Sequence, residues 1–122
     1  MGAVSKKRAY FFGLCAEIWA ACYLVATGHR ILKWRYKTSF GELDLIAMKQ
    51  NVVVVAEVKA RANIEEASMA LTRRSQKRIC KAAELFLMQN PDYVDKTIRF
   101  DLIAINGIGR LRHLDNAWSY SA

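Results

Sequence analysis

A run of four valines at residues 52–55 is the feature that most constrains the fold of this chain. Valine is β-branched and favours extended backbone, so residues 52–59 are expected to form a strand. Because the run is continuously apolar, both faces of this strand should be buried within a sheet. The strand ends in Ala56-Glu57-Val58-Lys59. Ionisable side chains at the end of so buried a strand are costly unless they have partners or a bound metal ion.

The flanking segments predict an α/β domain. Residues 9–27 are rich in Ala, Leu and aromatic residues and predict a helix capped by Gly28. Residues 65–89 carry a second helical pattern, which Asn90-Pro91 ends. Further strands are expected at residues 30–37, 41–48, 97–105 and in a short stretch through Leu114. The order predicts a mixed β-sheet of about five strands with helices packed against it.

Composition supports a single domain with a polyanionic partner. The 122 residues are 53% hydrophobic and include one proline, with no repeat or linker composition, so one domain is expected over residues 1–122. Residues 1–8 are expected to form a flexible basic tail. The formal net charge of +8 favours nucleic acid or an anionic membrane. Three cysteines without paired spacing indicate neither disulfides nor zinc, so a cytoplasmic location is expected.

The N-terminal segment has a second interpretation, because Ser5-Lys6-Lys7-Arg8 followed by the apolar residues 10–27 imitates a signal peptide or membrane anchor. Glu17 lies in the middle of that stretch, where a charge costs about 3 kcal/mol on insertion scales. Removing the segment would also leave the sheet with one substantial helix to cover it. We therefore expect no membrane partner, and an anchor over residues 10–27 remains the alternative.

Three charged side chains on neighbouring strands form the candidate site. Alternate residues of a strand share a face, so Glu57 and Lys59 point the same way. If Gln50-Asn51 forms a two-residue turn, the register puts Asp44 directly opposite Glu57, with Cβ atoms about 4.5–5.5 Å apart. A three-residue turn would instead put Asp44 on the face of Ala56. In the first register, both carboxylates can hold one divalent cation, Mg²⁺ or Mn²⁺.

Such a site points to phosphodiester hydrolysis. Two carboxylates facing each other destabilise a sheet unless something neutralises them, and a divalent cation does so. The cation can polarise a phosphate and lower the pKa of a bound water. Lys59 can orient that water or offset charge on the phosphoryl oxygens. The competing interpretation is that Glu57 and Lys59 form an exposed ion pair, worth at most about 1 kcal/mol.

Four sequence blocks resemble one protein family. Gly41-Glu42-Leu43-Asp44-Leu45-Ile46-Ala47 and Glu57-Val58-Lys59-Ala60-Arg61 resemble the GEIDLIA and EVKxR signatures of the YraN family. Gly13 with Glu17 resembles its G-x-x-x-E, and Arg99-Phe100-Asp101 its RFD strand. The family is similar to archaeal Holliday-junction resolvases of the PD-(D/E)XK nuclease superfamily. The resemblance implies a restriction-endonuclease-like core and a magnesium-dependent endodeoxyribonuclease acting on branched or otherwise structured DNA.

The resemblance also assigns roles to individual residues. Asp44 and Glu57 would be the metal ligands, Lys59 the catalytic lysine, and Glu17 a carboxylate approaching the metal from the first helix. Glu17 can equally be an acid that caps or pairs on a mostly buried helix. Related resolvases act as dimers, so a homodimer is a further expectation. His29 and His113 are isolated in the sequence and are assigned no role.

Nucleic acid would be bound by a group of basic and polar residues after the third strand, namely Arg61, Arg73, Arg74, Gln76, Lys77 and Arg78. Such a cluster can follow a phosphate backbone without reading base sequence. Any one of these residues can instead belong to a solvated helix face. The alternative to a nuclease is therefore a non-catalytic nucleic-acid-binding module that keeps the nuclease fold.

Overall fold

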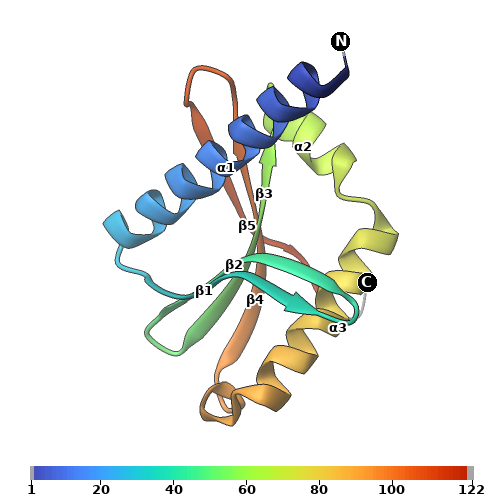
Figure 1. The fold of residues 1–122 in the computed structure, drawn as a ribbon. Helices are drawn as coiled ribbons and strands as arrows, with labels where there is room; N and C mark the ends of the chain where they lie inside the picture. Colours follow the sequence, from blue (N-terminus) through green and yellow to red (C-terminus); the bar gives the residue numbers. More distant parts are fainter. Residues whose placement is uncertain (1, 121–122) are drawn as a thin grey trace.

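The computed structural model describes residues 2–120. Within this range, the elements in chain order are α1 (Gly2–Ala26), β1 (Arg30–Thr38), β2 (Gly41–Lys49), β3 (Val52–Ala60), α2 (Ile64–Ala70), α3 (Arg73–Gln89), a 3₁₀ turn (Pro91–Tyr93), β4 (Thr97–Ile105) and β5 (Leu111–Trp118). The strands form one sheet in the order β1-β2-β3-β4-β5, in which β3 and β4 are parallel and the other neighbours antiparallel. This arrangement confirms the predicted α/β fold of restriction-endonuclease-like type (Figure 1).

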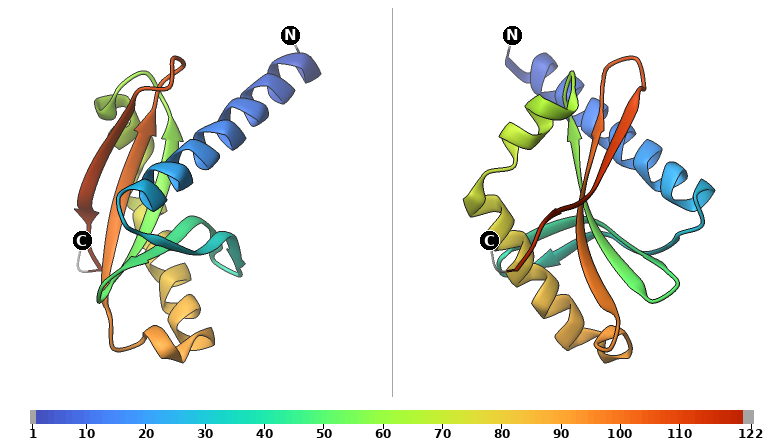
Figure 2. Two further views of the ribbon diagram at one scale, coloured as in Figure 1. Left: turned by 90° about the vertical axis from the view of Figure 1, so that its left-hand side faces the viewer. Right: turned by 180° about the vertical axis from the view of Figure 1, so that it is seen from behind.

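The central strand β3 is buried on both faces, as its valines predicted. Val53 and Val55 pack in a cluster that includes side chains of α3, whereas Val54 and Ala56 pack in a second cluster that includes side chains of α1. The two helices therefore cover opposite faces of β3, which explains why alternation is missing from its sequence. Figure 2 shows the strong twist of the sheet and the diagonal course of α1 across it.

Helix α1 starts at Gly2, earlier than the predicted start at residue 9. The prediction of a tail over residues 1–8 is therefore corrected for residues 2–8, which are helical, and residue 1 lies outside the described residues. Alanine and leucine at four-residue intervals, namely Ala16, Ala20 and Leu24, bury one side of the helix on the sheet. Gly28, with φ of 96°, ends it as predicted.

The outward side of α1 exposes large apolar side chains such as Phe11 and Trp19. The 21 residues Lys6–Ala26 are long and apolar enough to cross a membrane, with a mean hydropathy of 1.6. A core helix or a signal sequence meets the same criterion, so this is weak evidence for a span. The expectation that the protein has no membrane partner stays a prediction.

The helical pattern of residues 65–89 forms two helices instead of the predicted one. Helix α2 ends at Ala70, and α3 begins at Arg73 with Thr72 as its N-cap. The Thr72 hydroxyl accepts a hydrogen bond from the backbone N–H of Ser75 at 3.1 Å. This bond satisfies one of the N–H groups that have no partner within the helix at its start, so Thr72 marks the beginning of a separate helix.

The β2–β3 hairpin has the register that a two-residue turn requires. Lys49 pairs with Val52 across Gln50-Asn51, and Gln50 has φ of 55°. The ladder then runs as far as Leu45 opposite Ala56, while β2 continues to pair with β1 as far as Gly41. Beyond Leu45 the β1–β2 ribbon therefore leaves β3, and this divergence opens the sheet at the candidate site (Figure 1).

Candidate metal centre

Asp44 stands at the point where β2 leaves β3. Leu43 packs in the cluster that includes α3 and Leu45 in the cluster that includes α1, so β2 changes faces at Asp44. Asp44 Oδ2 accepts a hydrogen bond from the backbone N–H of Val58 at 2.9 Å. The carboxylate thus takes the place of a strand carbonyl that the diverging ribbon no longer supplies. The bend fixes the Asp44 side chain directly against β3.

The carboxyl groups of Asp44 and Glu57 lie close to each other, because the Val58 N–H that Asp44 accepts from directly follows Glu57 in β3 and each carboxyl group shifts the pKa of the other. Burial raises the pKa of Asp44 to about 8, and the charge of Glu57 acts in the same direction. Burial also raises the pKa of Glu57, although Lys59 and the interaction with Asp44 partly oppose it. Two acids in one partly buried space cannot both ionise freely, so the pair retains a proton near neutral pH unless a cation replaces it.

Lys59 lies beside this pair on the same face of β3. Its Nζ is 3.4 Å from Glu57 Oε2, and the two side chains are 24% and 14% exposed. Both residues line a cleft of about 300 Å³ that Ser75 and Arg78 of α3 close from the other side. Glu57 and the Lys59 ammonium group therefore line a cleft that α3 also borders, while Asp44 is not among its lining residues.

Glu17 extends from α1 toward the acid pair, but its carboxylate is hydrogen-bonded to side chains of β1. Its carboxylate accepts hydrogen bonds from Arg35 Nε at 2.9 Å, Arg35 Nη2 at 3.3 Å and Trp34 Nε1 at 2.9 Å. Its charge contributes to raising the pKa values of Asp44 and Glu57, so it lies within electrostatic range of both. Over the residues that the structure describes, no group of three or more His, Cys, Asp or Glu side chains is placed to hold a metal ion. The arrangement is a carboxylate pair with a nearby third acid bound to arginine.

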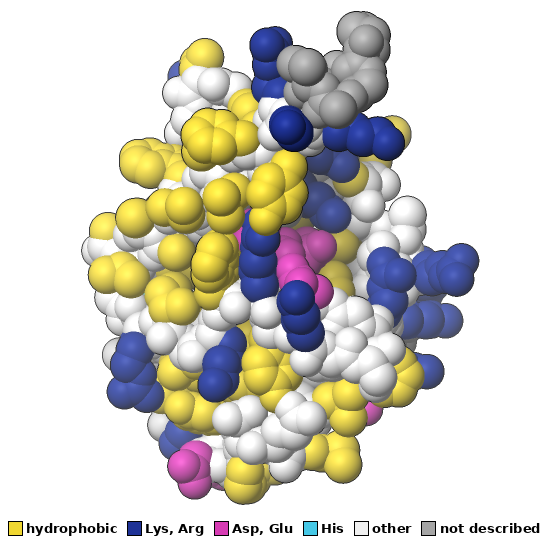
Figure 3. Space-filling model, viewed as in Figure 1, with side chains coloured by type: hydrophobic (Ala, Val, Ile, Leu, Met, Phe, Trp, Pro, Cys, Tyr) yellow, Lys and Arg dark blue, Asp and Glu magenta, His cyan; other side chains and the backbone are white. Residues whose placement is uncertain are grey.

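The basic residues predicted to bind nucleic acid divide between three places. Arg78 lines the cleft that contains Glu57 and Lys59. On the same helix, Arg73, Gln76 and Lys77 line a small separate depression, Arg74 is exposed, and Gln76 also donates a hydrogen bond to the Leu71 carbonyl. Arg61 lies beyond the end of β3. Figure 3 shows acidic side chains in the middle of one molecular face with Lys and Arg side chains on either side.

A buried polar network that the sequence did not predict lies around Asp101. This fully buried carboxylate accepts two hydrogen bonds of 2.9 Å from Arg99, one of 2.7 Å from His113 Nε2 and one of 3.0 Å from the Asn116 N–H. Tyr23 of α1 bonds to His113 Nδ1 at 2.8 Å. Burial by itself raises the pKa of Asp101, but these hydrogen bonds outweigh it and lower the pKa to about 2.

The network gives His113 a structural role, because it joins α1 to β4 and β5. Tyr23 and His113 are 90 residues apart, so no local pattern in the sequence could pair them. The one indication in the sequence is Asp101 itself, an acidic residue within an apolar strand. A buried acid requires hydrogen-bond partners, but the sequence does not identify them.

The sheet topology and the acid pair at the divergence of two strands define an α/β protein of restriction-endonuclease-like fold. The family follows from the comparison of sequences. The chain belongs to the uncharacterised protein family UPF0102, whose sequence profile matches residues 16–105. This confirms the resemblance to the YraN family.

Relatives in several bacteria share most of their length with this chain. A UPF0102 protein of Bradyrhizobium sp. (strain ORS 278) is 45% identical over 116 residues, which cover 95% of this chain and 82% of that protein. One from Rhodopseudomonas palustris (strain BisB18) is 41% identical over 119 residues, covering 98% and 88%. One from Bartonella bacilliformis is 43% identical over 100 residues, covering 82% of each. Their names state family membership and no activity.

Proposed function

We propose that this protein is a metal-dependent nuclease that hydrolyses phosphodiester bonds in branched or otherwise structured DNA. The observation that carries the proposal is the convergence of Asp44 and Glu57, since Asp44 Oδ2 accepts from the N–H of Val58, the residue after Glu57, at 2.9 Å, and Lys59 Nζ is 3.4 Å from Glu57. A purely structural role does not account for it. Two facing acids with raised pKa values weaken the fold, whereas the same acids are suited to holding a cation.

The donor set fits magnesium or manganese. Mg²⁺ takes oxygen ligands and is usually held by one or two carboxylates, with water and substrate phosphates completing its coordination. Asp44 and Glu57 would supply the two carboxylates, and the open cleft leaves room for the rest. When bound, the cation would supply Lewis-acid polarisation of a phosphate oxygen.

The surrounding side chains have distinct tasks in this proposal. Lys59 holds the Glu57 carboxylate in position and offsets negative charge on the phosphoryl oxygens of the substrate. Arg78, on the opposite wall of the cleft, binds a phosphate of the same strand. Glu17 is a positioning residue, because it holds Arg35 and does not itself touch the proposed substrate path.

The proposed substrate class has two supports of different kinds. The net charge of +8 and the exposed basic side chains of α3 favour binding of a polyanion, since each contact with a phosphate releases condensed counterions. The preference for branched DNA rests on the resemblance of the motifs to those of Holliday-junction resolvases. Contacts from basic side chains to phosphates would position a strand without reading its sequence, which suits recognition of shape.

A nicking assay tests the proposal. Wild-type protein is incubated with a labelled four-way junction and with the matching linear duplex, in Mg²⁺, Mn²⁺ or EDTA. We expect metal-dependent nicking, which Asp44→Asn, Glu57→Gln and Lys59→Ala each lower by at least about 100-fold. Asp95→Asn is the matched control, because this carboxylate is 75% exposed and is not among the residues that line the cleft. Activity that survives all three site variants would refute the assignment.

The alternative is a nucleic-acid-binding module without turnover. The observation in its favour is that no third acidic ligand joins the pair among the described residues. It predicts that DNA binding weakens steeply with salt, while calorimetry detects no uptake of Mg²⁺. Mg²⁺ uptake that is lost in Asp44→Asn decides for the metal centre over the binding module.

A further inference from the structure

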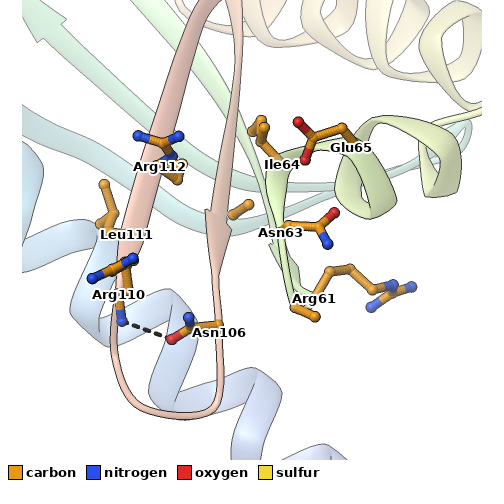
Figure 4. Close-up of a pocket in the computed structure, with 10 residues that line it drawn as sticks. Arg61, Asn63, Ile64, Glu65, Asn106, Arg110, Leu111 and Arg112 are labelled. Atoms are coloured by element: carbon orange, nitrogen blue, oxygen red, sulfur yellow. Dashed lines mark hydrogen bonds between the residues drawn. The ribbon is translucent and has the colours of Figure 1, made fainter.

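A second, larger pocket lies beyond the end of β3. It has a volume of about 450 Å³ and is bounded by the β3–α2 connection and the β4–β5 hairpin (Figure 4). Three of its lining residues are arginines, with Arg61 on the first side and Arg110 and Arg112 on the second. Ala104 of β4 forms part of the wall between them. Arginine side chains therefore meet this pocket from two separate parts of the chain.

The positive charge of the pocket is largely uncompensated. In the part of the chain that the structure describes, none of the three arginines takes part in an ion pair, and all are exposed. Arg61 Nη1 donates to the neighbouring Ala60 carbonyl at 3.0 Å. Glu65 is the acidic residue among those lining the pocket. Three guanidinium groups against one carboxylate leave an excess of charge that suits an anionic ligand.

The strand register connects this pocket to the candidate metal centre. Lys59 is aligned with Ala104 in the parallel β3–β4 pair, and Ala104 with Arg112 in the antiparallel β4–β5 pair. Aligned residues project from the same face of a sheet, and neighbouring strands are about 4.8 Å apart. Lys59 and Arg112 therefore stand on one face, about 10 Å apart, with the small side chain of Ala104 between them.

A nucleic-acid strand matches this spacing. Phosphates of one strand rise by about 3.4 Å each along the axis of a duplex, and their direct separation is longer, so about 10 Å spans at most about three nucleotides. The planar guanidinium of arginine binds two phosphate oxygens at once, which a lysine cannot do. Lys59, Ala104 and Arg112 thus lie in a line across β3, β4 and β5, with a cationic group at each end for a phosphate of the strand.

We propose that Arg61, Arg110 and Arg112 form a phosphate-binding subsite that holds the substrate strand a few nucleotides from the bond at the Asp44–Glu57 pair. The inference that the bound strand runs from this pocket to the metal centre rests on the proposed function. The inference that the pocket binds phosphate does not. The subsite would determine which phosphodiester bond of the strand lies at the metal centre and is cleaved.

Binding of a fluorescein-labelled oligothymidylate, measured by fluorescence anisotropy in EDTA, tests the subsite without any cleavage. The variants are Arg61→Ala and Arg112→Ala, each titrated at several salt concentrations. Arg30→Ala is the matched control, since Arg30 is also an exposed strand arginine but pairs with Met48 at the far end of the sheet. We expect each pocket variant to bind about three- to tenfold more weakly and to reduce the slope of log K against log salt by about 0.7.

A conservative variant separates charge from geometry. Arg112→Lys keeps the charge and so should keep the salt slope, but it loses bidentate contact and should bind more weakly than wild type. Slopes and affinities of the Arg61 and Arg112 variants equal to those of Arg30→Ala would overturn the subsite. Thermal melts of the same samples establish that each exposed arginine variant is folded.

The nicking assay distinguishes failure of the subsite from failure of the proposed function. If wild type nicks DNA and the pocket variants bind as the control does, the subsite is wrong and the nuclease stands. If wild type does not nick but Arg112→Ala lowers the salt slope, the nuclease is wrong and the phosphate-binding pocket stands. If both hold, Arg112→Ala should also shift the position of the cut along the strand.

Discussion

Replacing Asp101 by asparagine should destabilise the fold strongly, although Asp101 is outside the candidate metal centre. The buried carboxylate accepts four hydrogen bonds through two oxygens, two of them from Arg99. An asparagine offers one acceptor oxygen and turns an N–H₂ group toward donors. Arg99 and His113 would then lose their acceptor while remaining partly buried.

The size of the effect follows from two independent estimates. Removing one partner from a buried charge network typically costs about 3–5 kcal/mol. The pKa of Asp101 is lowered from 3.8 to about 2. At about 1.4 kcal/mol for each pKa unit, ionisation alone contributes about 2.5 kcal/mol. The cost of the substitution exceeds the contribution of ionisation, because asparagine also points an N–H₂ group at the donors of Arg99 or His113 and leaves them without an acceptor.

The sign of the pH dependence is fixed by the direction of the shift. The pKa of Asp101 is lowered in the folded protein, so its contribution is present above pH 3.8 and is lost as pH falls toward 2. Wild type should therefore lose about 2 kcal/mol from this residue between pH 5 and pH 2, and the remainder below pH 2. Asp101→Asn should lack that component of the acid sensitivity.

Urea unfolding followed by tryptophan fluorescence measures both quantities, at pH 7 and at several values below pH 5. Asp95→Asn is the control, since its side chain is 75% exposed and should change stability by less than about 0.5 kcal/mol. A loss below about 1 kcal/mol in Asp101→Asn at pH 7 would show that water or another side chain replaces the network.

Two further predictions concern the candidate centre. Burial raises the pKa of Asp44 to about 8, so its stabilising contribution is complete below pH 3.8 and is lost as pH rises through 8. Thermal melts in EDTA should therefore show Asp44→Asn gaining stability relative to wild type between pH 5 and pH 8, and an unchanged difference would contradict the buried acid pair. Glu17→Gln should cost about 1–2 kcal/mol in urea unfolding, because it weakens three hydrogen bonds to Trp34 and Arg35. It should lower nicking by less than about tenfold, and a loss as large as that in Asp44→Asn would instead make Glu17 a metal ligand.

Features set by neighbouring residues were predictable from the sequence. The valine run placed β3, and the two-residue turn at Gln50-Asn51 set the pairing of Lys49 with Val52. That register predicts Asp44 opposite Glu57, whereas the observed pairing ends one step earlier, at Leu45 opposite Ala56, where β2 turns away from β3. The helix break at Thr72 was missed, because the apolar periodicity of residues 65–89 continues across it and the threonine cap decides locally.

Contacts between distant segments were not predictable. Glu17 and Arg35 are 18 residues apart, and their ion pair depends on how α1 crosses the sheet. The Asp101 network likewise needs the packed positions of α1 and β5. Arg112 and Lys59 lie on the same face of the sheet because both are aligned with Ala104. The sequence alone does not give the register of either strand pair. Long-range geometry, and not residue type, was the missing information.

The topology of the sheet also separates the molecule into parts that should assemble at different times during folding. Asp44, Glu57 and Lys59 all lie in the β2–β3 hairpin, whose strands meet through a two-residue turn. The parallel pairing of β3 with β4 must wait until the chain between Ala60 and Thr97 has closed a long loop, an entropic delay that slows non-local contacts. The residues of the candidate centre thus belong to the fast-forming part of the chain, and the remainder of the sheet closes around an arrangement already established.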